Sequence, residues 1–391
     1  MQNKKSSNRS FNRTKKYLFN FGLFFVFTYI SALVLNKTLY GSYFPANINK
    51  CQEITDSIFG FRIICNKSQS LGLTNQYSIK KKDLNNFNIL IIGGSVAEDL
   101  HTDSSFNKLI KNAFIKEHPK VEASQINIFN AALPGGKQPQ GLFTLKSLEM
   151  LGYEFDLIIE LSGFNEMVLA IGENFSEYGI NPIYPRAQNL RSIHTADYIK
   201  NGPLSKIINI HPLTHTLKKS GIWDQSRRVF QQNTRKSSSK KLFMDFLMPE
   251  NINEASLLAK KIYKESVENM YYLSQRKGSH YILVLQPSHH LKNSKILSDE
   301  EKKLFYKSNY VTPWAKKAGE IINKSYSSID KRTFNIPNSN FVDLRGIFKE
   351  NSDSLYIDEC CHLSKEGMNL LSKEIIKVIN PHFKHIKIRS N

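Results

Sequence analysis

After residue 87 the chain alternates short apolar runs with longer amphipathic segments. The apolar runs have the length of strands buried on both faces, and the longer segments repeat apolar residues at helical spacing. The pattern predicts strands at 88–94, 126–133, 155–163, 280–287 and 340–348, and helices at 104–118, 140–153, 254–278, 299–326 and 364–379. Strands that alternate with helices predict right-handed crossovers and a parallel sheet covered on both faces. Active sites in such sheets lie at the carboxyl ends of the strands.

Two segments depart from this alternation. Residues 37–86 read as an irregular linker, and residues 168–253 interrupt the domain that we expect over 87–391. Within the interruption, basic residues at 218–241 greatly outnumber the single acid of that stretch, Asp224. We interpret this insertion as a solvated, mobile surface. The alternative is a cap over the active site that rests on anionic lipid headgroups or grips an anionic glycan.

The N-terminal segment predicts a membrane anchor. Residues 17–36 carry no charge and are rich in Phe, Leu and Val. About 20 apolar residues cross the roughly 30 Å hydrocarbon core of a bilayer, and the absence of an A-x-A-like site argues against a cleaved signal peptide. Residues 1–16 hold six Lys and Arg and no acid, which places the N-terminus in the cytoplasm. We expect a single-pass protein whose remaining chain is exported to the periplasm or the exterior.

The overall charge first suggests a nucleic-acid partner, because the 391 residues carry a formal net charge of +20. Part of this excess lies in the tail at 1–16, where it is a topology signal. No RNP, helix-turn-helix or finger pattern is present, and an exported domain rarely meets nucleic acid. We therefore expect no nucleic-acid partner.

The chain has four cysteines, which are Cys51, Cys65, Cys360 and Cys361. Cys51 and Cys65 could close a short loop beyond the membrane, but pairing cannot be read from a sequence. Cys360 and Cys361 are adjacent and precede His362, which raises zinc. Two neighbouring thiols are a poor start on a tetrahedral site, and no second cluster completes it. We expect neither a metal nor a cofactor.

Residues that could take part in catalysis follow several of the predicted strands or precede the last helix. They are Ser95, Gly135, Gly136, Asn165, Asp358, Glu359 and His362. Ser95 alone, after a Gly-Gly turn, suits a helix cap or a phosphate loop equally well. A serine, a glycine amide, an asparagine side chain and an acid-paired histidine together are the parts of an acyl-transfer site. His289 and His290 also follow a strand, but we interpret them as an exposed loop pair.

Four blocks of the sequence resemble those of the SGNH/GDSL hydrolase superfamily, in the branch whose first block reads GGSxA. The blocks are Gly93 to Ala97, Gly135 with Asn130 upstream, Gly163 to Glu166, and His362 to Ser364 with Gly367. They occur in the family's order between residues 88 and 379. The resemblance implies a flavodoxin-like three-layer α/β/α fold, and esterase or acyl-transfer chemistry without a cofactor.

The resemblance also implies roles for individual residues. Ser95 would be the nucleophile and His362 its base. The oxyanion would be held by the Ser95 amide, the amide of Gly135 or Gly136, and the Asn165 side chain.

The acid departs from the family pattern. The family's usual block is D-x-x-H, whereas position 359 is Glu and Asp358 lies four residues before the histidine. Spacing slightly favours Glu359 and residue type favours Asp358, so both stay candidates.

These observations predict a membrane-anchored serine esterase that acts on an acylated glycan, lipid or small molecule of the cell envelope. One alternative is an O-acyltransferase, in which the insertion presents an acceptor. The other is a non-catalytic envelope-binding protein with the same fold, which predicts that Ser95 and His362 point apart.

Overall fold

The computed structural model describes residues 52–56, 60–64, 86–187, 248–307, 320 and 322–386. At the centre of the described residues lies a parallel sheet in the order β4-β3-β5-β6-β7. Its strands are β3 (Phe87–Gly93), β4 (Ile126–Asn130), β5 (Leu157–Ser162), β6 (His280–Leu285) and β7 (Phe341–Asp343). Counted along the chain this is 2-1-3-4-5, the order of flavodoxin-like doubly wound sheets. The expected α/β class with a parallel sheet is confirmed.

The topology places a switch point at β3. The chain proceeds from β3 to β4 on one side, whereas β5 pairs with β3 on the other, so that Ile89 is in register with both Ile128 and Leu157. Residues 87–92 of β3 are all buried, as expected for a strand covered on both faces. In doubly wound sheets the crevice for ligands opens at the carboxyl ends of the strands beside such a switch point.

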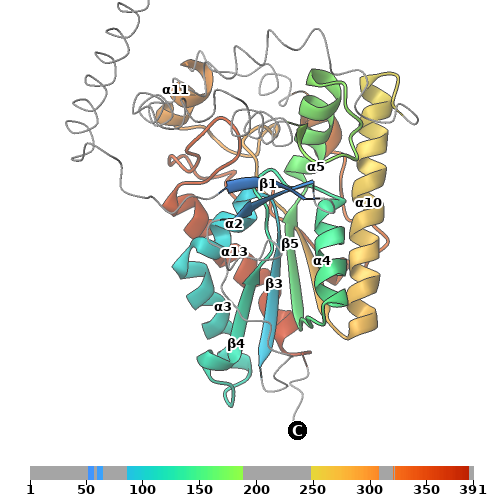
Figure 1. Ribbon diagram of the computed structural model, residues 1–391. Helices are drawn as coiled ribbons and strands as arrows, with labels where there is room; N and C mark the ends of the chain where they lie inside the picture. Colours follow the sequence, from blue (N-terminus) through green and yellow to red (C-terminus); the bar gives the residue numbers. More distant parts are fainter. Residues whose placement is uncertain are drawn as a thin grey trace, which may run out of the picture. The chain divides into compact units, whose positions relative to one another are not determined.

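Helices form a layer on each face of the sheet (Figure 1). One layer contains α2 (Ser95–Thr102), α3 (Ser104–Glu117) and α13 (Lys365–Phe383), and the other contains α4 (Gln140–Met150) and α10 (Ile252–Lys277). α3 packs on α13, and α10 packs on α4 and β6. The layers result from successive crossovers on opposite faces, since α2 and α3 precede β4 whereas α4 precedes β5.

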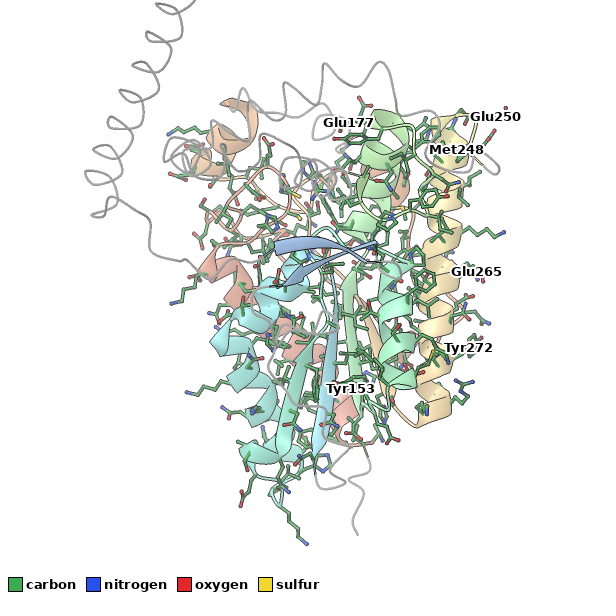
Figure 2. The ribbon with its side chains drawn as sticks, viewed as in Figure 1. Tyr153, Glu177, Met248, Glu250, Glu265 and Tyr272 are labelled. Carbon is green, nitrogen blue, oxygen red and sulfur yellow. The ribbon has the colours of Figure 1, made fainter. Side chains whose placement is uncertain are left out.

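The longest helix, α10, shows how local sequence determines an element. Its N-cap Asn251 accepts hydrogen bonds from two amides of the first turn, which is the usual role of Asn at this position. Tyr263 and Met270, seven residues apart, are buried on one face. Glu265 and Tyr272 lie on the outer face (Figure 2).

Smaller elements complete the described chain. They are α5 (Phe164–Met167), the π-helical η2 (Val168–Glu177), α11 (Asp299–Lys307), the π-helical η4 (Ile322–Tyr326), and the 3₁₀ turns η1 (Ala123–Gln125) and η5 (Asn338–Asn340). The strand expected over 340–348 is only three residues long. It ends early because a turn begins where the Arg345 amide donates to the Asp343 carboxylate.

Two expectations about irregular segments were partly wrong. Within 37–86, β1 (Gln52–Asp56) and β2 (Gly60–Ile64) form an antiparallel hairpin. The insertion begins with ordered structure, because η2 carries apolar residues that pack into the core and the Glu173 carboxylate pairs with Arg186 at 2.9 Å. A solvated surface therefore remains a prediction only for 188–247, which lies outside the described residues.

The expected membrane segment at 17–36 also lies outside the described residues. Among the helices that the structure does describe, none combines the length and the apolar character needed to span a bilayer.

Candidate active site

Ser95 occupies the tight turn between β3 and α2. Gly93 has φ of +154°, and a Cβ there would lie 2.1 Å from the carbonyl oxygen of Leu161 on β5. A Cβ on Gly94 would lie 2.3 Å from the Asn165 side-chain nitrogen. The two glycines thus let the turn approach β5 and Asn165 closely. Ser95 becomes the first residue of α2, where the helix N-terminus favours negative charge.

His362 reaches Ser95 from a loop far along the chain. Its Nε2 lies 2.7 Å from Ser95 Oγ, and its Nδ1 is hydrogen-bonded to Asp358. An antiparallel bridge between Tyr356 and Leu363 closes the base of this loop. The three side chains therefore form a continuous Ser-His-Asp chain of hydrogen bonds, the arrangement that activates a serine hydroxyl.

The carboxylate that holds His362 belongs to Asp358, so the preference for Glu359 by spacing was wrong. Asp358 Oδ1 accepts hydrogen bonds from three backbone amides, those of Cys360 at 2.9 Å, Cys361 at 3.0 Å and His362 at 3.2 Å. The backbone therefore wraps around the Asp358 side chain and brings residue i+4 against it. Glu359 contributes its carbonyl oxygen, which accepts a hydrogen bond from His290 Nε2 at 2.9 Å.

The acid and the base shift each other's pKa. Burial alone would raise the pKa of Asp358, but the hydrogen bond and charge of His362 and the backbone amides hold it below its usual value. The hydrogen bond to Asp358, opposed by desolvation, raises the pKa of His362 to about 9. The pair thus favours the protonated imidazolium form of His362.

Asn165 lies at the carboxyl end of β5, on α5. Gly163 precedes it with φ of +108°, and a Cβ there would come within 2.6 Å of the Tyr326 ring. The Asn165 Nδ2 group donates to the carbonyl of Gly136 at 2.8 Å. A side-chain amide carries two hydrogens, so the second can be donated to a ligand beside Gly94 and Ser95.

The geometry of the glycine loop after β4 bears on the choice between Gly135 and Gly136. The Gly136 amide donates to the Leu133 carbonyl at 2.6 Å, and Gly135 has φ of +72°. Leu133 to Gly136 is therefore a type II turn with Pro134 and Gly135 at its centre. This bond occupies the Gly136 amide, which argues against the shifted alternative and favours Gly135 as the donor from this loop.

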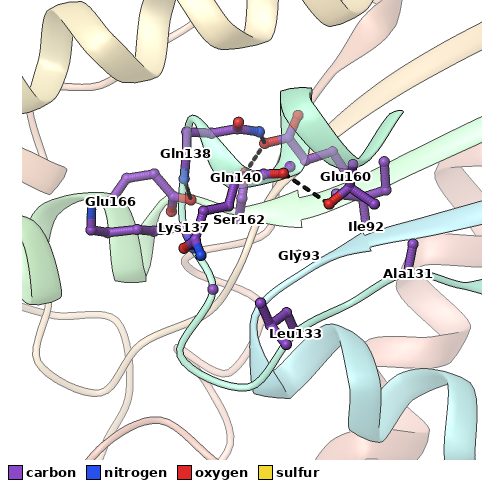
Figure 3. Close-up of a pocket in the computed structure, with 13 residues that line it drawn as sticks. Ile92, Gly93, Ala131, Leu133, Lys137, Gln138, Gln140, Glu160, Ser162 and Glu166 are labelled. Atoms are coloured by element: carbon purple, nitrogen blue, oxygen red, sulfur yellow. Dashed lines mark hydrogen bonds between the residues drawn. The ribbon is translucent and has the colours of Figure 1, made fainter. Parts of the chain in front are cut away.

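A buried carboxylate joins the glycine loop to the Asn165 turn. Glu166 accepts hydrogen bonds from the Gly163 amide at 2.7 Å and from the Gln138 amide at 3.1 Å. Burial, and then the charge of Glu160, raise the pKa of Glu166 to about 7. Gln138 in turn donates to Glu160 at 2.8 Å, so that it lies between the two acids (Figure 3). The two loops that would bind an oxyanion are thereby linked to each other.

This network lines a small pocket of about 20 Å³, room for roughly one water molecule. Glu160 is fully buried at its edge and also accepts hydrogen bonds from Ser162 at 2.7 Å and from Tyr281. Sequence reasoning missed Glu160 and Gln138. A signal existed for Glu160, because a charged residue within the apolar strand sequence LIIELS must be satisfied internally.

Lys137 connects the glycine loop to the start of the insertion. Its side chain is buried and donates to the Pro182 carbonyl. Burial lowers the pKa of Lys137 to about 7, against the opposing charges of Glu166 and Glu173. This contact, which the sequence did not indicate, fixes 178–187 beside the loop that carries Gly135.

We expected His289 and His290 to be an exposed pair, but both are partly buried in the structure. His290 donates to the carbonyl of Glu359, and the His289 ring packs edge-on against Tyr356 with centroids 4.8 Å apart. Burial lowers the pKa of both rings. Through these contacts the pair packs against the loop that carries Asp358 and His362.

No family model matches the chain, and no curated protein matches it either. Solved structures with a similar arrangement include an acetyl xylan esterase, AlAXEase, at 13% identity and a TM-score of 0.32, covering 75% of this chain and 100% of that one. A lipase/acylhydrolase from Enterococcus faecalis matches at 12% identity and a TM-score of 0.33, covering 78% of this chain and 100% of that one. At these values the likeness carries no argument about activity.

In the part of the chain that the structure describes, no group of three or more His, Cys, Asp or Glu residues is arranged to hold a metal ion.

Proposed function

We propose that the chain is a serine esterase that cleaves an O-acyl ester through an acyl-enzyme. The observation that carries this proposal is the 2.7 Å contact between Ser95 Oγ and His362 Nε2, with Asp358 on the other ring nitrogen. Asn165 and the Gly135 turn lie at the neighbouring strand ends, where an oxyanion would form.

In the proposed reaction His362 takes the Ser95 proton as Oγ attacks the ester carbonyl. The tetrahedral oxyanion is held by the amides of Ser95 and Gly135 and by the Asn165 side chain. His362 then gives its proton to the departing alkoxide, and an acyl group stays on Ser95. Water, deprotonated by His362, hydrolyses this acyl-enzyme and restores the serine.

The alternative functions have less support. A non-catalytic binding protein predicts that Ser95 and His362 point apart, and in the structure they are hydrogen-bonded. A transferase would need an acceptor site for which the insertion was the candidate, and 188–247 lies outside the described residues. The cell envelope as the location, and an envelope glycan or lipid as the substrate, are proposals that rest on the apolar segment 17–36.

Covalent labelling tests the proposal. A fluorophosphonate probe is expected to label the full chain once, and peptide mass spectrometry is expected to map the label to Ser95. Ser95→Ala should abolish labelling, whereas Ser124→Ala, at an exposed serine before β4, should leave it intact. Labelling that persists in Ser95→Ala, or a wild-type chain that never reacts and does not turn over p-nitrophenyl acetate, would refute the esterase assignment.

The pH dependence of turnover follows from the pKa of His362. His362 must be neutral to accept the serine proton, and Asp358 raises its pKa to about 9. We therefore expect kcat/KM for p-nitrophenyl acetate to be low near pH 7 and to rise through pH 9 before levelling off. Rates of Ser95→Ala at each pH correct for spontaneous hydrolysis. A profile already level between pH 6 and 7 would show that the imidazolium is not stabilised in this way.

A further inference from the structure

Two thiols lie within the loop that joins the acid to the base. Cys360 and Cys361 separate Asp358 from His362, and their sulfur atoms are 3.3 Å apart. Cys361 is buried at 2% exposure, and Cys360 is partly exposed. The loop therefore carries a vicinal dithiol, one sulfur of which is accessible, directly beside the catalytic histidine.

Charged groups of both signs lie near the vicinal pair, since the Asp358 carboxylate interacts with Cys361 and two cations interact with Cys360. The charge of Arg186 interacts with the Cys360 sulfur, and so does that of His362. The hydrogen bond with Cys360, together with burial, raises the pKa of Cys361 well above its usual value. Cys360 is partly exposed whereas Cys361 is buried, so Cys360 is the sulfur that a peroxide reaches first, with Cys361 placed to resolve the product.

We propose that Cys360 and Cys361 form a reversible modification site that peroxides oxidise to a vicinal disulfide and that trivalent arsenicals bind. The Cys360 thiolate attacks one oxygen of hydrogen peroxide, which gives a sulfenic acid and hydroxide. The Cys361 thiol then displaces water from the sulfenic sulfur and closes the S–S bond. Two thiols lose two electrons and two protons, and one peroxide becomes two waters. An arsenoxide instead condenses with both thiols and releases one water, without a redox change.

The ring geometry makes such a disulfide easy to reverse. Adjacent Cα atoms across a trans peptide lie about 3.8 Å apart, whereas disulfides usually join Cα atoms roughly 4.4–6.8 Å apart. Strain of this kind makes a disulfide more readily reduced, as expected of a regulatory bond rather than a structural one. Thiols such as dithiothreitol should therefore restore the reduced pair.

The same strain would be transmitted to the acid. The amides of Cys360 and Cys361 both donate to Asp358 Oδ1, and closing the eight-membered ring must rotate the peptide between them. Asp358 would lose at least one of the bonds that hold it against His362. Oxidation is thus expected to inhibit ester turnover, a consequence that rests on the proposed function, whereas formation of the disulfide does not.

The experiment uses the full chain with Cys51 and Cys65 replaced by serine, so that only the vicinal pair can react. Hydrogen peroxide is added, and the peptide holding both sulfurs is examined by mass spectrometry before and after dithiothreitol. Ester turnover is measured in the same samples, each relative to its own reduced form. Phenylarsine oxide is the second probe, and the same chain with Cys360→Ser is the matched control.

We expect the peptide to lose two hydrogens, turnover to fall about tenfold or more as Asp358 is displaced, and dithiothreitol to reverse both. Phenylarsine oxide should bind the reduced chain only, and Cys360→Ser should resist both reagents. A peptide whose mass never changes, or one that binds no arsenical, overturns the modification site. A disulfide that forms without loss of turnover overturns the coupling to Asp358. If the chain has no esterase activity, the mass and arsenical measurements still decide the site.

Discussion

Ester turnover is expected to fall by about 10⁴-fold or more in Ser95→Ala, in His362→Ala and, to nearly the same extent, in the double variant. In the proposed mechanism the two side chains act as one unit, because His362 would deprotonate Ser95 across their 2.7 Å contact. Once either partner is removed, the other has little left to contribute. Steady-state kcat/KM for p-nitrophenyl acetate measures all three losses.

The folded state must be intact for this comparison. Ser95 is the first residue of α2, so a circular dichroism melt should show that Ser95→Ala keeps its helices. Ser124→Ala controls for loss of a serine hydroxyl away from the site. Losses that simply multiply in the double variant would mean that Ser95 and His362 act independently, contrary to the proposed mechanism.

Asp358→Asn is expected to lower kcat/KM by about 10³–10⁴-fold, while Glu359→Gln stays near the wild-type value. An asparagine at 358 can present its NH₂ group to His362 Nδ1, which favours the tautomer whose Nε2 cannot accept the serine proton. Glu359 meets the site through its backbone carbonyl, which a glutamine also provides. The two isosteric variants therefore form a matched pair that differs by one position.

The pH profile of Asp358→Asn distinguishes a role of Asp358 in positioning His362 from general destabilisation of the loop. The Asp358 carboxylate is the main reason why the pKa of His362 lies at about 9, so Asp358→Asn should move the rise in kcat/KM to lower pH. A merely destabilised loop would lower the rate without moving the profile. If Glu359→Gln showed the larger loss and the shifted profile, the assignment of Asp358 would be wrong.

Much of the fold could be predicted because the parallel strands are apolar throughout and the helices between them are amphipathic. This pattern depends on burial alone, which is why β3 to β6 were located within a few residues. The hairpin of β1 and β2 and the packed start of the insertion were missed, because each depends on pairing that a local pattern does not show. Glu173 and Arg186, for example, are too far apart in the sequence for their ion pair to be read from it.

The site residues also differ in how far the sequence alone could predict them. Ser95 and Asn165 could be proposed from the sequence because strand ends in a parallel sheet meet at one edge, and His362 because the block before the last helix resembles the histidine block of the SGNH/GDSL superfamily. The choice between Asp358 and Glu359 depended on which side chain the following amides surround, and spacing does not encode this. The choice between Gly135 and Gly136 could have been made, since Pro-Gly is the signature of a type II turn with the glycine at its third position.

The Tyr356–Leu363 bridge closes the loop that carries Asp358 and His362. The proposed site therefore has two parts, one at the strand ends and one in this loop. Everything that would bind and polarise an ester is attached to the ends of three strands and shares the rigidity of the sheet. The base that would accept and return the proton, His362, and its partner Asp358 belong to one short loop closed at its own base. A change in that loop can therefore silence the chemistry and leave a folded protein that still captures its ligand, so a switch between enzyme and receptor would need only a few residues.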